Sequence, residues 1–146
     1  MKLLVINGAN INFTGIREKE IYGTNSYNDL VKLIKKTSKD NLIKVKVCQS
    51  NSEGKIINAI QRAYFKKVDA IIINPGAYTH YSYAIRDAIK SVNIKTIEVH
   101  LSDIKNREDF RKNSVISDVC VATFSGKGFD SYKEAINYLG NNHNIY

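Results

Sequence analysis

The feature that most constrains the fold of this chain is a regular alternation of short apolar segments with longer amphipathic ones. The short segments resemble β-strands in length and composition, and in the longer ones apolar residues recur at the spacing of one helix face. Strand, helix and strand in succession are typical of right-handed crossovers in a parallel sheet. The expected strands are residues 2–7, 43–49, 70–74, 95–100 and 119–125, and the expected helices are residues 26–39, 52–65, 82–90 and 130–139, the last closed by Gly140.

This alternation predicts an α/β fold with a single domain over residues 1–146. The expected architecture is a flavodoxin-like three-layer sandwich, in which five parallel strands have the order 2-1-3-4-5. The segment 70–74 is almost wholly apolar. Such a segment is expected for a strand that is covered on both faces of the sheet.

Polar residues gather just after the expected strands and not before them. In open α/β sheets the ligand lies beyond the carboxyl ends of the strands, where the strand order reverses. The sequence therefore predicts a functional site at this edge of the sheet. The segments concerned are 7–12, 49–51, 74–80, 98–102 and 125–128.

Charge and composition argue against several classes of partner. The formal net charge is +8, but lysine and arginine are scattered, without the basic and aromatic stripe of a nucleic-acid surface. No apolar run approaches the roughly 20 residues that cross a bilayer, so we expect a cytoplasmic protein with no membrane partner. Cys48 and Cys120 lack the spacing of a metal or redox motif, which favours buried free thiols.

Two glycine-containing segments fall short of nucleotide-binding motifs. Residues 53–55 lack the earlier glycine and the following Ser or Thr of a phosphate-binding loop. Residues 126–128 are followed by Ser131 where a dinucleotide fingerprint has its third glycine. We therefore expect no nucleotide cofactor.

Glu98 and His100 are two residues apart on an expected strand, so their side chains point to the same face. A carboxylate beside an imidazole fixes the orientation of the ring and favours its protonated form, as a general acid requires. Two alternatives remain open: a structural histidine with a satisfied partner, and a zinc site with His80 as a third ligand. The zinc alternative lacks a histidine pair at i, i+4 or a cysteine cluster.

The connection over residues 11–23 is too long for a tight turn, and we interpret it as a lid over the site. It contains Arg17 and Tyr22. A tyrosine acts as a base only if its pKa falls from about 10 toward neutrality, and a nearby guanidinium favours that change. Most loop tyrosines, however, only pack. The residues alone thus indicate an enzyme that handles a polar, anionic small molecule by acid–base chemistry, and a flavodoxin-like signalling or binding module stays open.

Four motifs stand in order along nearly the whole chain: NGANIN at 7–12 with Arg17 and Tyr22 beyond it, QSNSEG at 49–54, NPGAYTH at 74–80 continuing to Asp87, and EVHLS at 98–102 followed by Arg107 and Arg111. Together they resemble the type II 3-dehydroquinate dehydratases. The resemblance implies a flavodoxin-like hydro-lyase of the shikimate pathway, in aromatic amino-acid biosynthesis, that needs no cofactor, metal or Schiff base.

The resemblance also implies a role for each matching residue. The enzymes of this family remove a proton alpha to the ketone of 3-dehydroquinate and expel the beta-hydroxyl through an enolate, to give 3-dehydroshikimate and water. Carried over, Tyr22 is the proton acceptor, Arg17 its activator and charge stabiliser, Asn10 a stabiliser of the enolate, His100 the proton donor and Glu98 the residue that orients it, while Asn74, His80 and Arg111 hold ring hydroxyls and Leu101 and Ser102 bind the carboxylate.

One implied contact crosses between subunits. Asp87 is expected to reach toward the site of a neighbouring copy, which implies a homo-oligomer, usually a dodecamer built as a tetramer of trimers.

Overall fold

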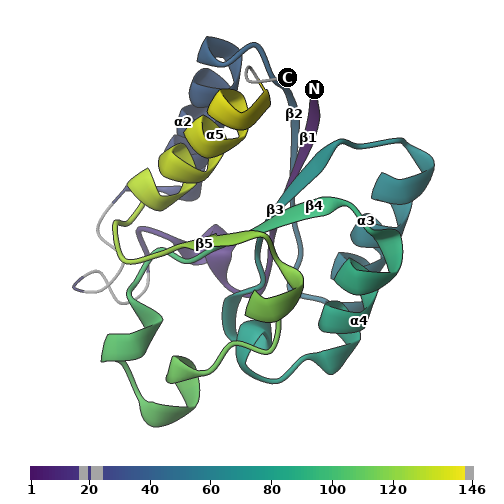
Figure 1. Cartoon of the computed structure of the whole chain (residues 1–146). Helices are drawn as coiled ribbons and strands as arrows, with labels where there is room; N and C mark the ends of the chain where they lie inside the picture. The colour runs from purple at the N-terminus through teal and green to yellow at the C-terminus, as the bar shows by residue number, and fades with distance from the viewer. Residues whose placement is uncertain (17–19, 21–24, 144–146) are drawn as a thin grey trace.

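The computed structural model of the chain describes residues 1–16, 20 and 25–143 and forms three layers (Figure 1). All strand pairings are parallel, and the order β2-β1-β3-β4-β5 confirms the predicted topology. Helices α2 and α5 cover one face of the sheet, and α3 and α4 cover the other. The strands are β1 (Lys2–Asn7), β2 (Lys44–Gln49), β3 (Ala70–Asn74), β4 (Lys95–Val99) and β5 (Ala122–Phe124), and the helices are α2 (Tyr27–Asp40), α3 (Glu53–Phe65), α4 (Tyr83–Val92) and α5 (Asp130–His143).

Three of the helices begin at a serine whose side chain caps the first turn. The Ser26 hydroxyl oxygen accepts a hydrogen bond from the Asp29 backbone N–H, and the Ser26 N–H donates to the Asp29 carboxylate, which completes a capping box. The Ser52 and Ser82 hydroxyl oxygens cap α3 and α4 by accepting from the backbone N–H groups of Lys55 and Ile85. Each cap satisfies a backbone N–H that has no partner within the helix, and contributes about 1 kcal/mol.

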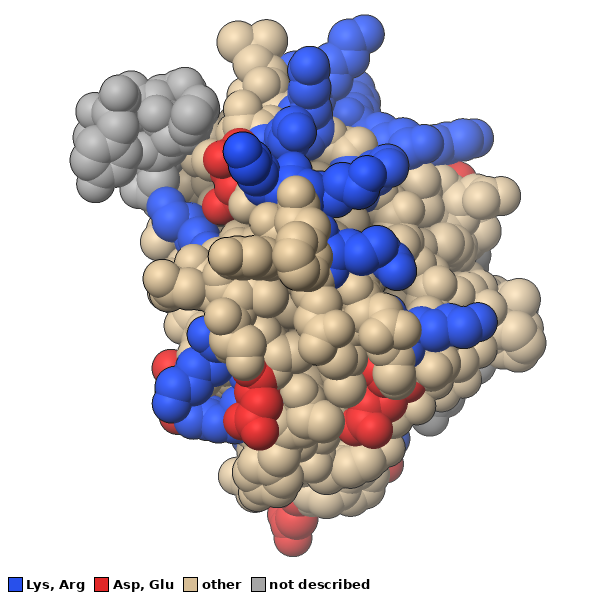
Figure 2. Space-filling model, turned by 90° about the vertical axis from the view of Figure 1, so that its right-hand side faces the viewer, with Lys and Arg blue, Asp and Glu red and all other residues tan. Residues whose placement is uncertain are grey.

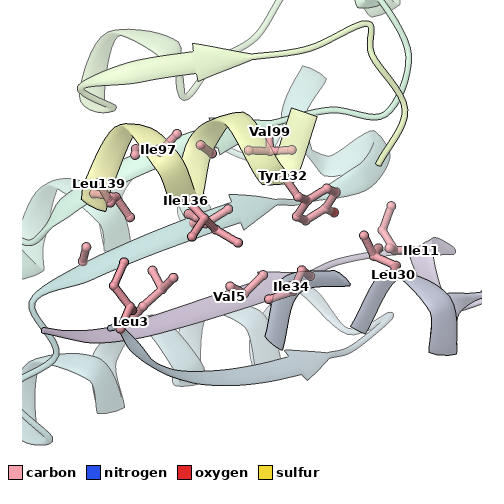
Figure 3. Close-up of a cluster of buried hydrophobic side chains, with 14 of the residues drawn as sticks. Leu3, Val5, Ile11, Leu30, Ile34, Ile97, Val99, Tyr132, Ile136 and Leu139 are labelled. Carbon is pink, nitrogen blue, oxygen red and sulfur yellow. The ribbon is translucent and has the colours of Figure 1, made fainter. Parts of the chain in front are cut away.

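The core is divided in two by the sheet, because side chains alternate between its faces. Along β3, Ile72 points toward α2 and α5, whereas Ile71 and Ile73 point toward α3 and α4. Figure 3 shows the first of these clusters, with the side chains of α2 and α5 directed at the strands. Its labelled members are Leu3, Val5, Ile11, Leu30, Ile34, Ile97, Val99, Tyr132, Ile136 and Leu139.

The prediction that Gly140 closes the last helix is wrong, because α5 continues to His143. Gly140 instead lies where α5 approaches the end of α2. A Cβ atom at Gly140 would stand 2.0 Å from Oδ1 of Asn41. The Asn41 amide itself donates to the Thr37 carbonyl and to Asn137 Oδ1, both at 2.9 Å. The glycine therefore permits a close contact between helices and is not a terminator.

The predicted last strand was too long at its beginning. Ser117–Val119 form a one-turn 3-10 helix, and the strand starts only at Ala122. The apolar residues Val119 and Cys120 pack against the core on the α3 and α4 side, and they are not part of the pairing between β4 and β5. Sequence periodicity cannot separate these two uses of a short apolar run.

The link from β4 to β5 contains two further one-turn 3-10 helices, Ile104–Asn106 and Asp109–Lys112, which the sequence did not predict. A single turn is too short to show helical periodicity. These turns decide where Arg107 and Arg111 lie.

Both cysteines are free thiols, as predicted, but they are half-buried and not buried. Burial raises the pKa of the Cys120 thiol to about 12, which keeps it in the unreactive form at neutral pH. Within residues 1–16, 20 and 25–143, no helix is long and apolar enough to cross a membrane.

Figure 2 shows how the positive charge is distributed on one face. Most of the lysine and arginine side chains on this face gather toward the end of the molecule at which β1 begins, and a smaller group lies toward the opposite end, together with most of the acidic side chains. On this face the basic excess therefore lies away from the carboxyl ends of the strands.

Candidate active site

A cavity opens at the carboxyl ends of β1, β3 and β4, and we call it the strand-end cavity. It lies at the edge that the sequence predicted, beside the point where the strand order reverses between β1 and β3. Both hydrophobic and polar side chains line it, with two histidines and two arginines among them. The lining residues are Ala9, Asn10, Ile11, Asn74, Gly76, Ala77, His80, His100, Leu101, Ser102, Ile104, Arg107 and Arg111.

Two loops cross closely to form the floor of this cavity. A Cβ atom at Gly8 would lie 2.4 Å from the Pro75 carbonyl oxygen, and one at Gly76 would lie 2.5 Å from the Ala9 carbonyl oxygen. Gly76 also has a φ of +67°, which side chains disfavour. Only glycine at both positions allows the backbones after β1 and β3 to pack at this distance.

Asn10 follows this crossing with a left-handed backbone at φ 67°. Asparagine tolerates this conformation better than most residues. The Asn10 N–H donates to Oδ1 of Asn51 at 3.0 Å, and the same oxygen accepts from Gln49 Nε2 at 3.1 Å. The residues that end β2 therefore hold Asn10 at the cavity wall.

The Glu98 and His100 side chains lie on the same face, as their spacing predicts. Glu98 Oε2 is 2.5 Å from His100 Nε2. Glu98 is fully buried and His100 is 5% exposed, so the pair is shielded from water except through the cavity. This bond leaves Nδ1 as the ring nitrogen that can exchange a proton with a ligand.

The second carboxylate oxygen of Glu98 also has partners. Ser117 Oγ donates to Oε1 at 2.5 Å, and Thr123 Oγ1 donates to it at 3.2 Å. Burial alone would raise the pKa of Glu98, but the hydrogen bonds and charge of His100 and the Ser117 hydroxyl outweigh it, and the pKa lies below its ordinary value. Glu98 is therefore an ionised carboxylate at neutral pH, and it can stabilise positive charge on the ring that it contacts.

His80 is fixed in a definite tautomer. Its Nδ1 lies 2.7 Å from the Asn113 carbonyl oxygen, which can only accept, so Nδ1 carries the proton. Burial lowers the pKa of His80, and the nearby Arg111 lowers it further, against the effect of the Asn113 bond. The neutral ring leaves Nε2 as an acceptor for a hydroxyl group.

Two arginines make part of the wall electropositive, and one of them lies beside a serine. Arg111 Nε donates to Glu108 at 2.6 Å, and its guanidinium lies 4.8 Å from the centre of the Phe110 ring. Arg107 Nη1 is 3.5 Å from Ser102 Oγ. Because an arginine can only donate, the Ser102 proton stays available for an anionic ligand.

The described part of the chain contains no group of three or more His, Cys, Asp or Glu side chains that could hold a metal ion. His80 and His100 face the same cavity, but one nitrogen of each is already bonded, to Asn113 and Glu98 respectively. The arrangement is suited to proton transfer and to binding a hydroxylated anion.

A sequence model of the class II dehydroquinases matches residues 1–140. The chain belongs to this family. Proteins named 3-dehydroquinate dehydratase are 61% identical over 131 residues in Caldicellulosiruptor bescii, covering 90% of both chains, and 58% identical over 141 residues in Clostridium acetobutylicum, covering 97% of both. The crystal structure of a type II dehydroquinase from Butyrivibrio crossotus has a TM-score of 0.93 at 56% identity, over 95% of this chain and 97% of that one.

Most of the site residues expected from the dehydroquinase resemblance meet at the strand-end cavity. Glu98 does not line the cavity itself, but its carboxylate contacts the ring of His100, which does. Asp87 is exposed on α4 and does not line the cavity of its own chain. Arg17 and Tyr22 lie outside the described residues. The predicted residues on the wall are Asn10, Asn74, His80, His100, Leu101, Ser102 and Arg111.

Several residues that organise this dehydroquinase site were not predicted. Ser117 and Thr123 hold Glu98 from 19 and 25 residues away in sequence, and Tyr132 bonds Asn74 from 58 residues away. None has a local signal, since serine, threonine and tyrosine occur throughout the chain. A sequence signal exists only for the segment 49–51, which holds Asn10, because its polar residues stand at the end of an expected strand.

Proposed function

We propose that this protein is a type II 3-dehydroquinate dehydratase, a hydro-lyase of the shikimate pathway that converts 3-dehydroquinate to 3-dehydroshikimate and water. The observation that carries the proposal is the buried Glu98–His100 pair, which opens on a cavity in a chain whose family match spans residues 1–140.

The reaction needs an acid at the departing hydroxyl and a base at the carbon next to the ketone. His100 is proposed to donate a proton to the hydroxyl as the carbon–oxygen bond breaks, so that water leaves. Glu98 supports this role because its carboxylate stabilises the imidazolium before the transfer and keeps the ring oriented. The enzyme regains its starting protonation state when the base releases the proton that it took and His100 takes one up from solvent.

Tyr22 is proposed as the base and Arg17 as the residue that favours its phenolate. Both roles rest on the family resemblance, because neither residue is among those described. Asn10 would stabilise the enolate oxygen that forms when the base removes the proton. Its position on the wall, fixed through Asn51, supports this assignment.

The remaining polar groups are proposed to bind the substrate. Asn74, His80 and Arg111 would hold the ring hydroxyls, and the acceptor Nε2 of His80 suits a hydroxyl donor. The Leu101 backbone N–H and the Ser102 hydroxyl would bind the carboxylate, which the nearby arginines favour electrostatically.

Asp87 is proposed to complete the site of a neighbouring subunit in a homododecamer made of four trimers. Its exposure on α4, away from the cavity of its own chain, supports a contact of this kind. We also propose that the protein acts in the cytoplasm, without a nucleic-acid or membrane partner.

The deciding experiment is a steady-state assay with pure 3-dehydroquinate, followed by the growth of enone absorbance. We expect turnover that a chelator does not change, and no lysine adduct after borohydride treatment with substrate. The His100→Ala variant should lose about 10²- to 10⁴-fold in kcat, the usual contribution of a general acid. Tyr22→Phe should abolish turnover and leave binding largely intact. A wild-type protein without turnover from neutral to alkaline pH would refute the proposal.

A further inference from the structure

Tyr132 of α5 is fully buried, and its hydroxyl lies between two asparagines at the ends of neighbouring strands. Its Oη donates to Asn7 Oδ1 at 2.7 Å and accepts from Asn74 Nδ2 at 2.8 Å. Asn7 and Asn74 are register partners in β1 and β3, so their side chains lie side by side on the α5 face. Figure 3 shows the Tyr132 ring pointing from α5 in toward the sheet.

The direction of each hydrogen bond in this group can be assigned from one backbone amide. The Gly76 N–H donates to Asn74 Oδ1 at 3.2 Å, so the oxygen of the Asn74 amide faces Gly76 and its nitrogen faces Tyr132, at the shorter distance of 2.8 Å. Since an amide nitrogen can only donate, Tyr132 accepts from Asn74 and gives its single proton to Asn7. Burial raises the pKa of Tyr132, so the hydroxyl keeps that proton.

Asn74 also lines the strand-end cavity. Two of its four hydrogen-bonding positions are used, one by Tyr132 and one by Gly76. One N–H and one oxygen lone pair remain for a ligand. A rotation of the Asn74 amide by 180° would place its NH₂ group against the Gly76 N–H, so that two donors would face each other. It would also exchange the positions of the donor and the acceptor that Asn74 offers to a ligand in the cavity.

Tyr132 does not line the cavity, so it cannot touch a ligand there. A residue that served only to fill this part of the core would not require a hydroxyl. A buried polar group destabilises the fold when it lacks hydrogen-bond partners. Here the Tyr132 hydroxyl is bonded to both asparagines, and both polar atoms of the Asn74 side chain have a partner.

We propose that Tyr132 is a positioning residue that holds the Asn74 amide in the orientation in which it binds a substrate hydroxyl. The inference rests on the proposed function, since it takes Asn74 as a substrate-binding residue. It adds a residue of α5 to the machinery of a site that is otherwise built at strand ends.

The first test is Tyr132→Phe, which removes the hydroxyl and keeps the ring that packs in the core. We expect KM for 3-dehydroquinate to rise about five- to tenfold, the loss expected for one neutral hydrogen bond, with kcat changed less than about twofold. The matched control is Tyr138→Phe, the same change on the same helix at a half-buried residue whose ring lies 5.7 Å from Phe124. It should leave both constants unchanged.

A double-mutant cycle separates positioning from a general loss of structure. In an Asn74→Ala background, Tyr132→Phe should have no further effect on kcat/KM, because the group that it orients is gone. Full additivity of the two losses, or an unchanged KM in Tyr132→Phe alone, would overturn the inference.

A crystal structure of the Tyr132→Phe variant tests the same inference without turnover. We expect the Asn74 side chain to rotate or to occupy two conformations. An Asn74 amide that keeps its bond to Gly76 in a single, unchanged conformation would contradict the positioning role. An inactive wild-type protein would refute the proposed function, and the structural result would still decide whether Tyr132 holds Asn74.

Discussion

Both oxygens of the Glu98 carboxylate have hydrogen-bond partners, although the residue is fully buried. A buried charge is unfavourable unless it is paired and hydrogen-bonded, and three side chains meet this requirement here. They are His100, which directly follows β4, Ser117 in the 3-10 turn Ser117–Val119, and Thr123 in β5. At the residue scale, the acid of the proposed reaction thus depends on groups that never touch the substrate.

Ser117→Ala should therefore reduce activity without changing the cavity wall. Loss of the 2.5 Å bond to Glu98 weakens the carboxylate that stabilises the imidazolium. We expect kcat to fall about tenfold, as for the loss of a hydrogen bond to a charged group, and KM to change little. Ser117→Thr, which keeps a hydroxyl, serves as the control and should retain most of the activity. Equal kcat values for the wild type and the alanine variant would show that Ser117 has no part in catalysis.

Substrate affinity should respond to the titration of His80. Burial lowers the pKa of this ring below the ordinary value of 6.5, so it stays neutral until the pH falls further than for an exposed histidine. On protonation Nε2 becomes a donor and can no longer accept from a hydroxyl. We expect KM to stay constant as the pH falls through 6.5 and to rise only below it, measured by initial rates. A His80→Asn variant should lose this acid-side rise, and a rise centred above 6.5 would be inconsistent with the buried neutral ring.

At the scale of helices and strands, the helix ends show which local sequence signals predict the structure correctly. The expected helices begin at residues 26, 52 and 82, and in the structure each of these serines is a cap, which depends only on neighbours within three residues. Gly140 was misread, because its role depends on Asn41, which is 99 positions earlier and meets it only after α2 and α5 pack. A glycine near a helix end can either terminate the helix or permit a close contact with a neighbouring helix, and the local sequence does not separate these two roles.

Two helix glycines should therefore respond in opposite directions to replacement by alanine. Gly140→Ala should lower the free energy of unfolding by about 1–3 kcal/mol, because the new Cβ displaces Asn41 from its bonds to Thr37 and Asn137. Gly54→Ala in α3 is the matched control, since its Cβ meets only Ser52 Oγ at 3.8 Å. It should leave stability unchanged or raise it by up to about 1 kcal/mol. Urea denaturation of both variants provides the comparison, and a stabilising Gly140→Ala would show that the helices separate there readily.

At the scale of the whole molecule, the sheet divides the core and gathers the polar strand ends at one edge. The stability of this arrangement should depend on pH through Glu98. Its pKa is lower in the folded state than the ordinary value of 4.5, so the folded state favours the ionised form. Glu98 thus contributes stability that is fully present well above 4.5 and is lost as the pH falls through the folded pKa.

Glu98→Gln should flatten this acid-side loss. We expect the unfolding free energy of the variant to depend less steeply on pH below about 4.5 than that of the wild type, measured by urea denaturation at a series of pH values. Glu20→Gln is the control, because it makes the same change at an exposed glutamate. Identical slopes for Glu98→Gln and wild type would mean that Glu98 does not favour folding through its charge.

The class of fold, the strand order, the edge with the candidate site and the Glu98–His100 pair could all be predicted from the sequence. These follow from periodicity, from two-residue spacing along a strand and from the rule that parallel strands end together, all of which are local or topological. Other contacts became known only from the packed fold: Ser117 and Thr123 hold Glu98, Asn113 sets the His80 tautomer, and Tyr132 reaches Asn7 and Asn74. These contacts join residues that are remote in sequence, and the distances between them are defined only when the helices pack on the sheet.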